Sequence, residues 1–323
     1  MQQGKQRILG FDIARVFSMF YVIAVYHILG YTTILYHNPL ILSLVYSSLG
    51  TFTFLSSFLL TSRYSFEGRE AIVLFYKKRV LRIYPLFLIS SVLLLIIGFN
   101  DITSTIKGLL GISPLWGPHP RTLWYVSMLL LFYAVTPLLS KGTLIKKVST
   151  YLVLNFLFAI LSVSLSSVNI ATFVYFAIYF IGVIIGSHYK EKVMAALFEP
   201  KLILVSLVIL FLIAINLFVN NNYYRIISGS LGIFAFLNIS CLLGGGISEK
   251  YKHFKRIVEF ASYASMCAYL FHREIFETML TLYHPQKAFL LVLYLLFVGV
   301  PIVLVLSYFI QRYYDSAIKK LFP

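Results

Sequence analysis

The sequence is poor in charged residues and in cysteine, and each shortage excludes a class of protein. Only 12% of the 323 residues are charged, about half the fraction of an ordinary soluble domain, whereas 60% are hydrophobic. A soluble protein of this composition could not cover its core with a water-compatible surface. The two cysteines, Cys241 and Cys267, fall inside apolar segments and are interpreted as buried, unpaired side chains. Because no Cys/His metal-binding spacing is present either, we expect no metal.

Long apolar segments take the place of a soluble core. A bilayer-spanning helix needs about 20 apolar residues, and its backbone polar groups must be satisfied within the segment. Segments of this kind are predicted at 11–31, 40–61, 83–99, 123–140, 149–166, 170–187, 201–219, 226–245, 257–280 and 288–311. The predicted fold class is therefore all-α, a polytopic membrane bundle of about ten transmembrane helices, with residues 1–323 forming a single domain.

The net charge of +16 is distributed as in a membrane protein and not as in a nucleic-acid-binding protein. Short basic clusters alternate with apolar segments, and cytoplasmic loops are the ones that carry excess Lys and Arg. With both termini cytoplasmic, the outer side would hold Lys107, Arg121, Arg225 and Lys287, and Arg15 and Arg273 would lie within spans. Every other Lys and Arg, including Lys5, Arg7 and Lys250, would lie on the inner side. We therefore predict cytoplasmic termini and no nucleic-acid partner.

The first predicted span contains three ionisable residues, which are costly in a membrane and usually functional. Asp12 and Arg15 are three residues apart, so they share a helix face and can pair. His27 lies about 18 Å further along the helix axis, in the outer half of the membrane. It is either a packing histidine that is hydrogen-bonded inside the bundle or a general base, since a neutral imidazole accepts a proton near neutral pH.

A basic cluster precedes the third span, where Arg79 and Arg82 share one helix face. Such a cluster often contacts anionic lipid headgroups. Alternatively, two guanidinium groups on one face suit the phosphates of a cytoplasmic ligand.

Two further positions lie near the outer side. His272 in the ninth span reaches a depth similar to that of His27, so the two histidines are able to converge on one cavity. Trp124 stands at the outer end of the fourth span, where Trp is favoured at the membrane interface.

These segments, in this order, resemble acyltransferase family three, the integral membrane O-acyltransferases that modify bacterial surface sugars. The similar stretches are Phe11 to Arg15 with His27, the aromatic and serine-rich Gly50 to Leu60, Tyr76 to Pro85, the Trp-led Leu123 to Pro137, and Ser262 to His272. The resemblance covers most of the first 140 residues and returns at 257–275.

The resemblance implies transfer of an acyl group, most often acetyl, from cytoplasmic acetyl-CoA or another acyl-CoA to a sugar hydroxyl of a surface or lipid-linked polysaccharide. The expected location is the inner cell membrane, where the partners are acyl-CoA, the glycan acceptor and membrane lipid. His27 would be the catalytic base, acting directly or through an acylated form. The resemblance also implies which residues bind the donor, namely Arg15, Arg79 and Arg82. Asp12, Tyr84, Trp124 and His272 would line the cavity.

One departure from the family pattern concerns the first helix, which has one extra residue between Arg15 and His27. An extra residue rotates an α-helix by about 100°, so the two side chains share a face only if a bulge absorbs the difference. A function from another class is also compatible with the helical frame, namely a transporter or flippase of a lipid-linked glycan. That alternative leaves the paired arginines and the buried histidine unexplained.

Overall fold

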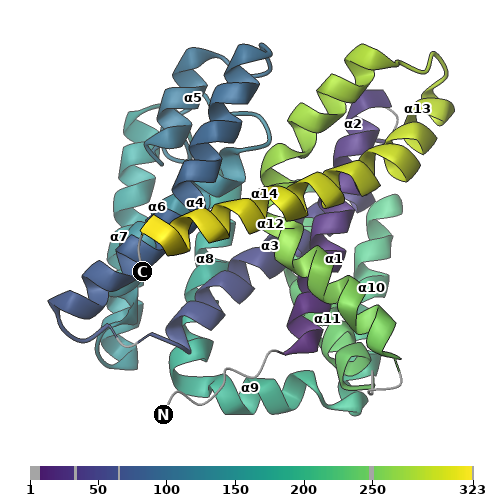
Figure 1. Cartoon of the computed structure of the whole chain (residues 1–323). Helices are drawn as coiled ribbons and strands as arrows, with labels where there is room; N and C mark the ends of the chain where they lie inside the picture. The colour runs from purple at the N-terminus through teal and green to yellow at the C-terminus, as the bar shows by residue number, and fades with distance from the viewer. Residues whose placement is uncertain (1–7, 33–34, 65, 247–250, 322–323) are drawn as a thin grey trace. The chain divides into compact units, whose positions relative to one another are not determined.

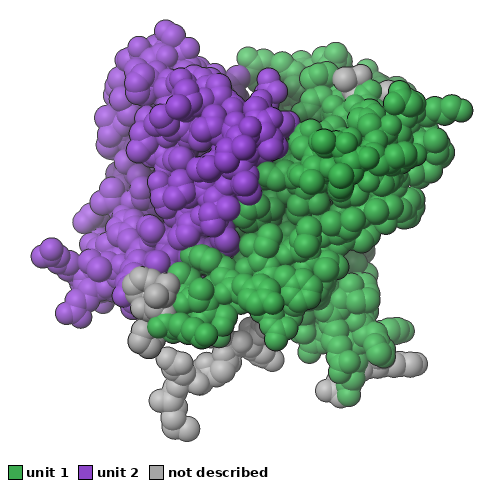
Figure 2. All heavy atoms as spheres, turned by 45° about the horizontal axis from the view of Figure 1, so that its top comes forward, with its two compact units in different colours: residues 1–52, 191–323 green, residues 53–190 purple. Residues whose placement is uncertain are grey.

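The computed structural model describes residues 8–32, 35–64, 66–246 and 251–321, and every regular element in these ranges is a helix (Figure 1). The inner-side charges Lys5, Arg7 and Lys250 lie outside the described residues. The helices group into two compact units, residues 1–52 with 191–323 and residues 53–190 (Figure 2). Helix α3 (Pro39–Thr61) begins in unit 1 and ends in unit 2.

Unit 1 joins the two ends of the chain around helix α12. Besides the first part of α3, its elements are α1 (Leu9–Phe20), η1 (Tyr21–His27), α2 (Ile28–Thr32), α9 (Lys190–Leu197), η3 (Pro200–Leu202), α10 (Ile203–Ala214), η4 (Ile215–Leu217), α11 (Asn222–Gly246), α12 (Lys252–Leu282), α13 (Ala288–Tyr294), η6 (Leu295–Gly299) and α14 (Val300–Leu321). Helix α1 packs against both α11 and α12, and α12 also packs along α14.

Small residues let helices of unit 1 approach closely, as is common in membrane bundles. Gly10 of α1 faces the backbone of Cys241 on α11, where a Cβ would meet the Cys241 Cα at 2.6 Å. Between α3 and α11, the Ser47 hydroxyl donates to the Gly229 carbonyl (2.8 Å). These contacts hold α1, α3 and α11 together with little bulk between them.

Unit 2 is formed by the middle of the chain. It consists of the second part of α3 together with α4 (Arg69–Ile96), α5 (Ile102–Leu109), α6 (Trp124–Ser140), α7 (Leu144–Ser164), α8 (Ile170–Ile184) and η2 (Ile185–Tyr189). Gly182 of α8 lies against Ser57 of α3, so that a Cβ there would overlap the serine hydroxyl. Side-chain hydrogen bonds join further pairs, including Thr53 with Tyr125 (3.0 Å) and Thr136 with Tyr179 (2.6 Å).

The all-α, membrane-spanning fold class is confirmed. Among the described residues, eight helices are long and apolar enough to cross a membrane, and each coincides with a predicted span. The predicted span 123–140 corresponds to the shorter apolar helix Trp124–Ser140. The span 257–280 lies inside the 31-residue helix α12, whose charged residues lower its hydropathy. For these two segments, membrane crossing stays a prediction.

Two helices occupy sequence that was expected to form connections. Helix α4 begins at Arg69, so the basic cluster with Arg79 and Arg82 lies on its first turns and not in a loop. Helix α5 lies within the connection 100–122 and is capped by the Asp101 carboxylate, which accepts from the Ser104 backbone N–H (2.9 Å).

Candidate functional site

His27 and His272 are in direct contact inside unit 1. Nδ1 of His27 lies 2.6 Å from Nε2 of His272, and both residues are buried. The ring planes are nearly parallel (5°), with centroids 4.7 Å apart. With the centroids 4.7 Å apart, the two nitrogens can be 2.6 Å from each other only if each points towards the other ring. The rings therefore meet edge to edge. The contact is therefore an N–H···N hydrogen bond and not a face-to-face stack.

A backbone carbonyl sets the direction of this hydrogen bond. Nδ1 of His272 lies 2.8 Å from the Tyr269 carbonyl oxygen, which can only accept, so Nδ1 of His272 carries a proton. In a neutral His272, Nε2 then has the lone pair and accepts from Nδ1–H of His27. A neutral His27 consequently holds its own lone pair on Nε2, to which no described residue bonds. This is the atom that a general base uses.

Charged and aromatic groups surround the pair on the same two helices. The guanidinium of Arg273, which is 8% exposed, lies 4.8 Å from the centroid of the Tyr31 ring. The Tyr31 hydroxyl donates to Glu277 (2.9 Å). Unit 1 therefore places a buried cation beside the two histidines and holds it against an aromatic ring.

The π-helical segment η1 lies between Arg15 and His27, where a bulge was required. In an unbroken α-helix the two side chains would point about 120° apart, whereas the additional residue of one π turn reduces this to about 20°. The expected pairing of Asp12 and Arg15 is confirmed, with 3.7 Å between Oδ1 and Nη1. Asp12 also accepts from the Ser262 hydroxyl (2.6 Å), which ties α1 to α12.

Arg79 and Arg82 lie on α4 in unit 2 and differ in their surroundings. Arg79 is partly buried, and its Cζ lies 5.9 Å from the centroid of the Tyr64 ring. Its Nε is buried and has no hydrogen-bond partner among the described residues. Arg82 is exposed on the surface of the helix. Of the two arginines, Arg79 is the one that turns inward.

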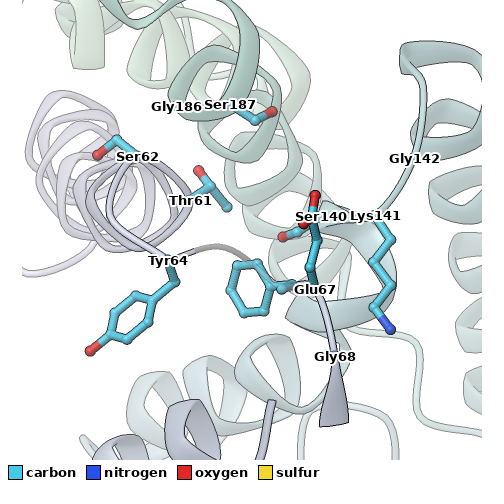
Figure 3. Close-up of a pocket in the computed structure, with 11 residues that line it drawn as sticks. Thr61, Ser62, Tyr64, Glu67, Gly68, Ser140, Lys141, Gly142, Gly186 and Ser187 are labelled. Atoms are coloured by element: carbon cyan, nitrogen blue, oxygen red, sulfur yellow. The ribbon is translucent and has the colours of Figure 1, made fainter. Parts of the chain in front are cut away.

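A pocket of about 750 Å³ lies in unit 2 beside Tyr64 (Figure 3). Its lining comes from the ends of several helices and consists of Thr61, Ser62, Tyr64, Phe66, Glu67, Gly68, Ser140, Lys141, Gly142, Gly186 and Ser187. Its volume lies in the range of small-molecule sites. The polar side chains that line it suit a polar ligand.

Comparison with known proteins supports the same class of chemistry. Residues 8–312 match the acyltransferase domain that defines acyltransferase family three. The chain belongs to this family. No curated protein and no solved structure matches the sequence. The match crosses both units, and with the helical fold it identifies a multi-pass membrane acyltransferase.

The remaining predicted residues of this family member have less distinctive surroundings. Trp124 begins α6 and packs near Tyr125 and Tyr175, with ring centroids 6.0 and 6.2 Å away. Tyr84 is partly buried on α4 near Phe87. The roles of these two residues in a cavity stay predictions. Within the described ranges, no three His, Cys, Asp or Glu side chains gather at one point.

Sequence reasoning missed two basic residues of this acyltransferase. Arg273 was placed within a span but given no role, although its position inside an apolar helix is itself a functional signal. Lys147 was counted as an inner-side loop charge, yet it lies in the first turn of α7 and is only 3% exposed. No pattern in the sequence distinguishes Lys147 from its exposed neighbour Lys146.

Proposed function

We propose that the chain transfers an acyl group, most often acetyl, from cytoplasmic acyl-CoA to a sugar hydroxyl of a surface or lipid-linked polysaccharide in the inner cell membrane. The observation that carries this proposal is the hydrogen-bonded pair of His27 and His272. Family membership supports acyl transfer, and the pair supplies a base whose acceptor nitrogen is defined by its partners.

In the proposed reaction, Nε2 of His27 removes the proton from the acceptor hydroxyl as its oxygen attacks the thioester carbonyl. The new C–O bond gives a tetrahedral intermediate, and the C–S bond then breaks. The leaving thiolate takes the proton back from His27 and departs as coenzyme A. Because Nδ1–H of His27 stays bonded to His272, the imidazolium that forms keeps its orientation.

A two-step route would use the same nitrogen. There, Nε2 of His27 attacks the thioester carbonyl first, and the C–S bond breaks to release coenzyme A as its thiolate. The sugar hydroxyl then attacks the acyl carbonyl, the N–C bond breaks, and the freed imidazole nitrogen takes the hydroxyl proton. Rapid quenching after mixing with a labelled acyl donor and no acceptor separates the two routes, because only the two-step route labels the protein.

The donor-binding part of the proposal rests on unit 2. Arg79 and Arg82 would contact donor phosphates, since charge-assisted hydrogen bonds to phosphate are among the strong ones. The buried, unpartnered Nε of Arg79 supports this role, because a buried donor without a partner is costly until a ligand supplies one.

The decisive experiment measures free thiol released from acetyl-CoA by purified protein in detergent, in the presence of a glycan acceptor. We expect release by the wild type and a loss of at least about 10²-fold for His27→Ala, which is the scale of general base catalysis. His253→Ala removes an exposed histidine of the same unit and should behave as the wild type. Glycan transport without thiol release would overturn the proposal in favour of a flippase.

A further inference from the structure

Lys147 is a buried basic residue that has no carboxylate beside it in the described part of unit 2. The side chain is 3% exposed, and its Nζ donates to the Ser187 hydroxyl at 2.9 Å. Among the described residues, no carboxylate lies within ion-pair distance of this ammonium group. An unpaired ammonium group is costly to bury, and an anionic group that binds beside it stabilises the charged form, so this position suits an anionic ligand.

The partner of Lys147 lines the pocket of unit 2. Ser187, which holds the Lys147 ammonium, is one of the pocket residues, and Lys141 is another (Figure 3). The pocket also includes Tyr64, whose ring lies next to Arg79. Two buried basic groups, the ammonium of Lys147 and Nε of Arg79, are thus each one residue away from the same cavity.

The backbone at one side of the pocket adds hydrogen-bond donors. Gly68 lines the pocket and is the N-cap of α4, where no side chain caps the helix. The first N–H groups of a helix have no partner within it, and the helix dipole favours an anion there. Glu67 also lines the pocket but is exposed.

Another part of the pocket favours hydrogen-bond donors of a ligand instead of an anion. Helices α3 and α6 end at Thr61 and Ser140, both of which line the pocket. Helix C-termini present carbonyl oxygens, which favour hydrogen-bond donors. The aromatic side chains of Tyr64 and Phe66 lie along the same lining. A ligand that combines phosphate, hydroxyl or amino groups and a flat ring satisfies all three features, whereas inorganic phosphate satisfies only the first.

We propose that this pocket binds the phosphorylated nucleotide end of the acyl donor, with Lys147 as the charge partner of a phosphate group. The inference deepens the proposed function and rests on it for the identity of the donor. It adds Lys147, Ser187 and the N-terminus of α4 to the predicted arginines. A lipid headgroup shares the phosphate but has no ring for Tyr64 and Phe66 to contact.

The test measures the affinity of the purified full-length protein for adenosine 3′,5′-bisphosphate by calorimetry, in detergent and without any acyl transfer. We expect Lys147→Met to weaken binding at least about tenfold, since a hydrogen bond to a charged group contributes this much. Lys147→Arg should restore most of the affinity. The matched control Lys192→Met removes an exposed charge expected on the same side of the membrane and should bind as the wild type.

Thermal unfolding provides a second measurement that does not depend on how well a variant expresses. At the same concentration, the bisphosphate should raise the unfolding temperature of the wild type more than that of Lys147→Met. Equal affinities of wild type and Lys147→Met, or no binding by the wild type, would overturn the inference. A competition experiment with micelles that contain phosphatidylglycerol tests for a lipid headgroup. If the lipid displaces the bisphosphate and the protein shows no preference for the nucleotide, the inference is overturned in favour of a lipid headgroup.

The two proposals fail in different ways. Bisphosphate binding that depends on Lys147, without thiol release from acetyl-CoA, would retain the pocket and reject acyl transfer from this donor. Thiol release with the same donor KM in wild type and Lys147→Met would retain the proposed function and reject the pocket.

Discussion

In unit 1 the candidate site residues His27 and Asp12 are each hydrogen-bonded to a side chain of another helix, whereas in unit 2 two buried basic groups lie beside a pocket without an opposite charge among the described residues. His27 bonds to His272, and Asp12 bonds to Ser262. In unit 2, Lys147 has only a hydroxyl partner, and Nε of Arg79 has none. This difference is the one that the two proposals require: a base whose geometry is complete before the reaction, and a binding site that a ligand would complete.

This difference has an energetic reason. A base must be oriented before the reaction, so its partners belong to the protein. A binding site gains affinity when the ligand supplies the charge or acceptor that buried groups lack, because their desolvation cost is then offset only in the complex.

The largest expected effect concerns the paired side of the comparison. His272→Ala leaves Nδ1 of His27 without its acceptor, so its tautomer and ring orientation are no longer defined. We expect kcat to fall on the order of 10²-fold, because general base catalysis contributes about 10²–10⁴-fold, and the donor KM to stay unchanged.

The measurement for His272 is steady-state kinetics of thiol release over a range of pH. His272→Gln retains a hydrogen-bonding side chain and should recover part of kcat. An unchanged kcat in His272→Ala would show that the second histidine only packs against the first.

The next effect distinguishes the two arginines of unit 2. Arg79→Ala should raise the donor KM at least about tenfold, because a charge-assisted hydrogen bond contributes about 1.5–3 kcal/mol. Arg82→Ala should raise it less, since Arg82 is exposed. Lys77→Ala removes another exposed charge of α4 as a control. Lower expression of both arginine variants with an unchanged donor KM would instead assign the cluster to lipid headgroups.

A smaller effect tests the packing that frames the pocket. Gly182→Ala places a methyl group against Ser57, and overpacking of this kind costs about 1–3 kcal/mol. Gly246→Ala is a control in unit 1, where a Cβ meets no atom within 4 Å. Thermal unfolding in detergent should therefore show a lower midpoint for the first variant only. Equal midpoints would mean that α3 and α8 separate easily enough to accept the methyl group.

The smallest effect depends on pH and involves the connection between α5 and α6. Burial lowers the pKa of His119 below its ordinary value of 6.5. The unfolded chain then binds the proton more readily, so the contribution of His119 to stability is complete above pH 6.5 and is lost as the pH falls below it. His119→Gln should reduce the dependence of the unfolding midpoint on pH between 7.5 and 5. An identical dependence in both proteins would show that this imidazole is solvated.

The membrane-spanning segments could be predicted from the sequence because length and apolar composition determine them. The beginnings of α4 and α12 could not, since Lys and Arg are good helix formers that hydropathy does not register as helix. Both helices extend into basic sequence that resembles a connection.

The sequence predicts how deep in the membrane the two histidines of the candidate site lie, but not that their side chains face each other. Counting residues from the membrane surface places His27 and His272 at similar levels, because the rise of a helix is regular. Their contact also depends on how α12 packs against α1, which one sequence does not reveal. Lys147 was missed for the same reason, since its burial comes from its place in unit 2 and not from its neighbours in the sequence.

The π-helical segment η1 has a consequence for how the first membrane helix tolerates a change in length. An insertion in a regular transmembrane helix turns every later side chain towards a different neighbour, from protein to lipid or the reverse. A π turn confines the added residue to Tyr21–His27, so α1 before it and α2 after it keep their facing surfaces. Deleting one residue within this segment should likewise be accommodated by a return to α-helical geometry. A change of one residue in this segment is therefore compatible with unchanged facing surfaces of α1 and α2.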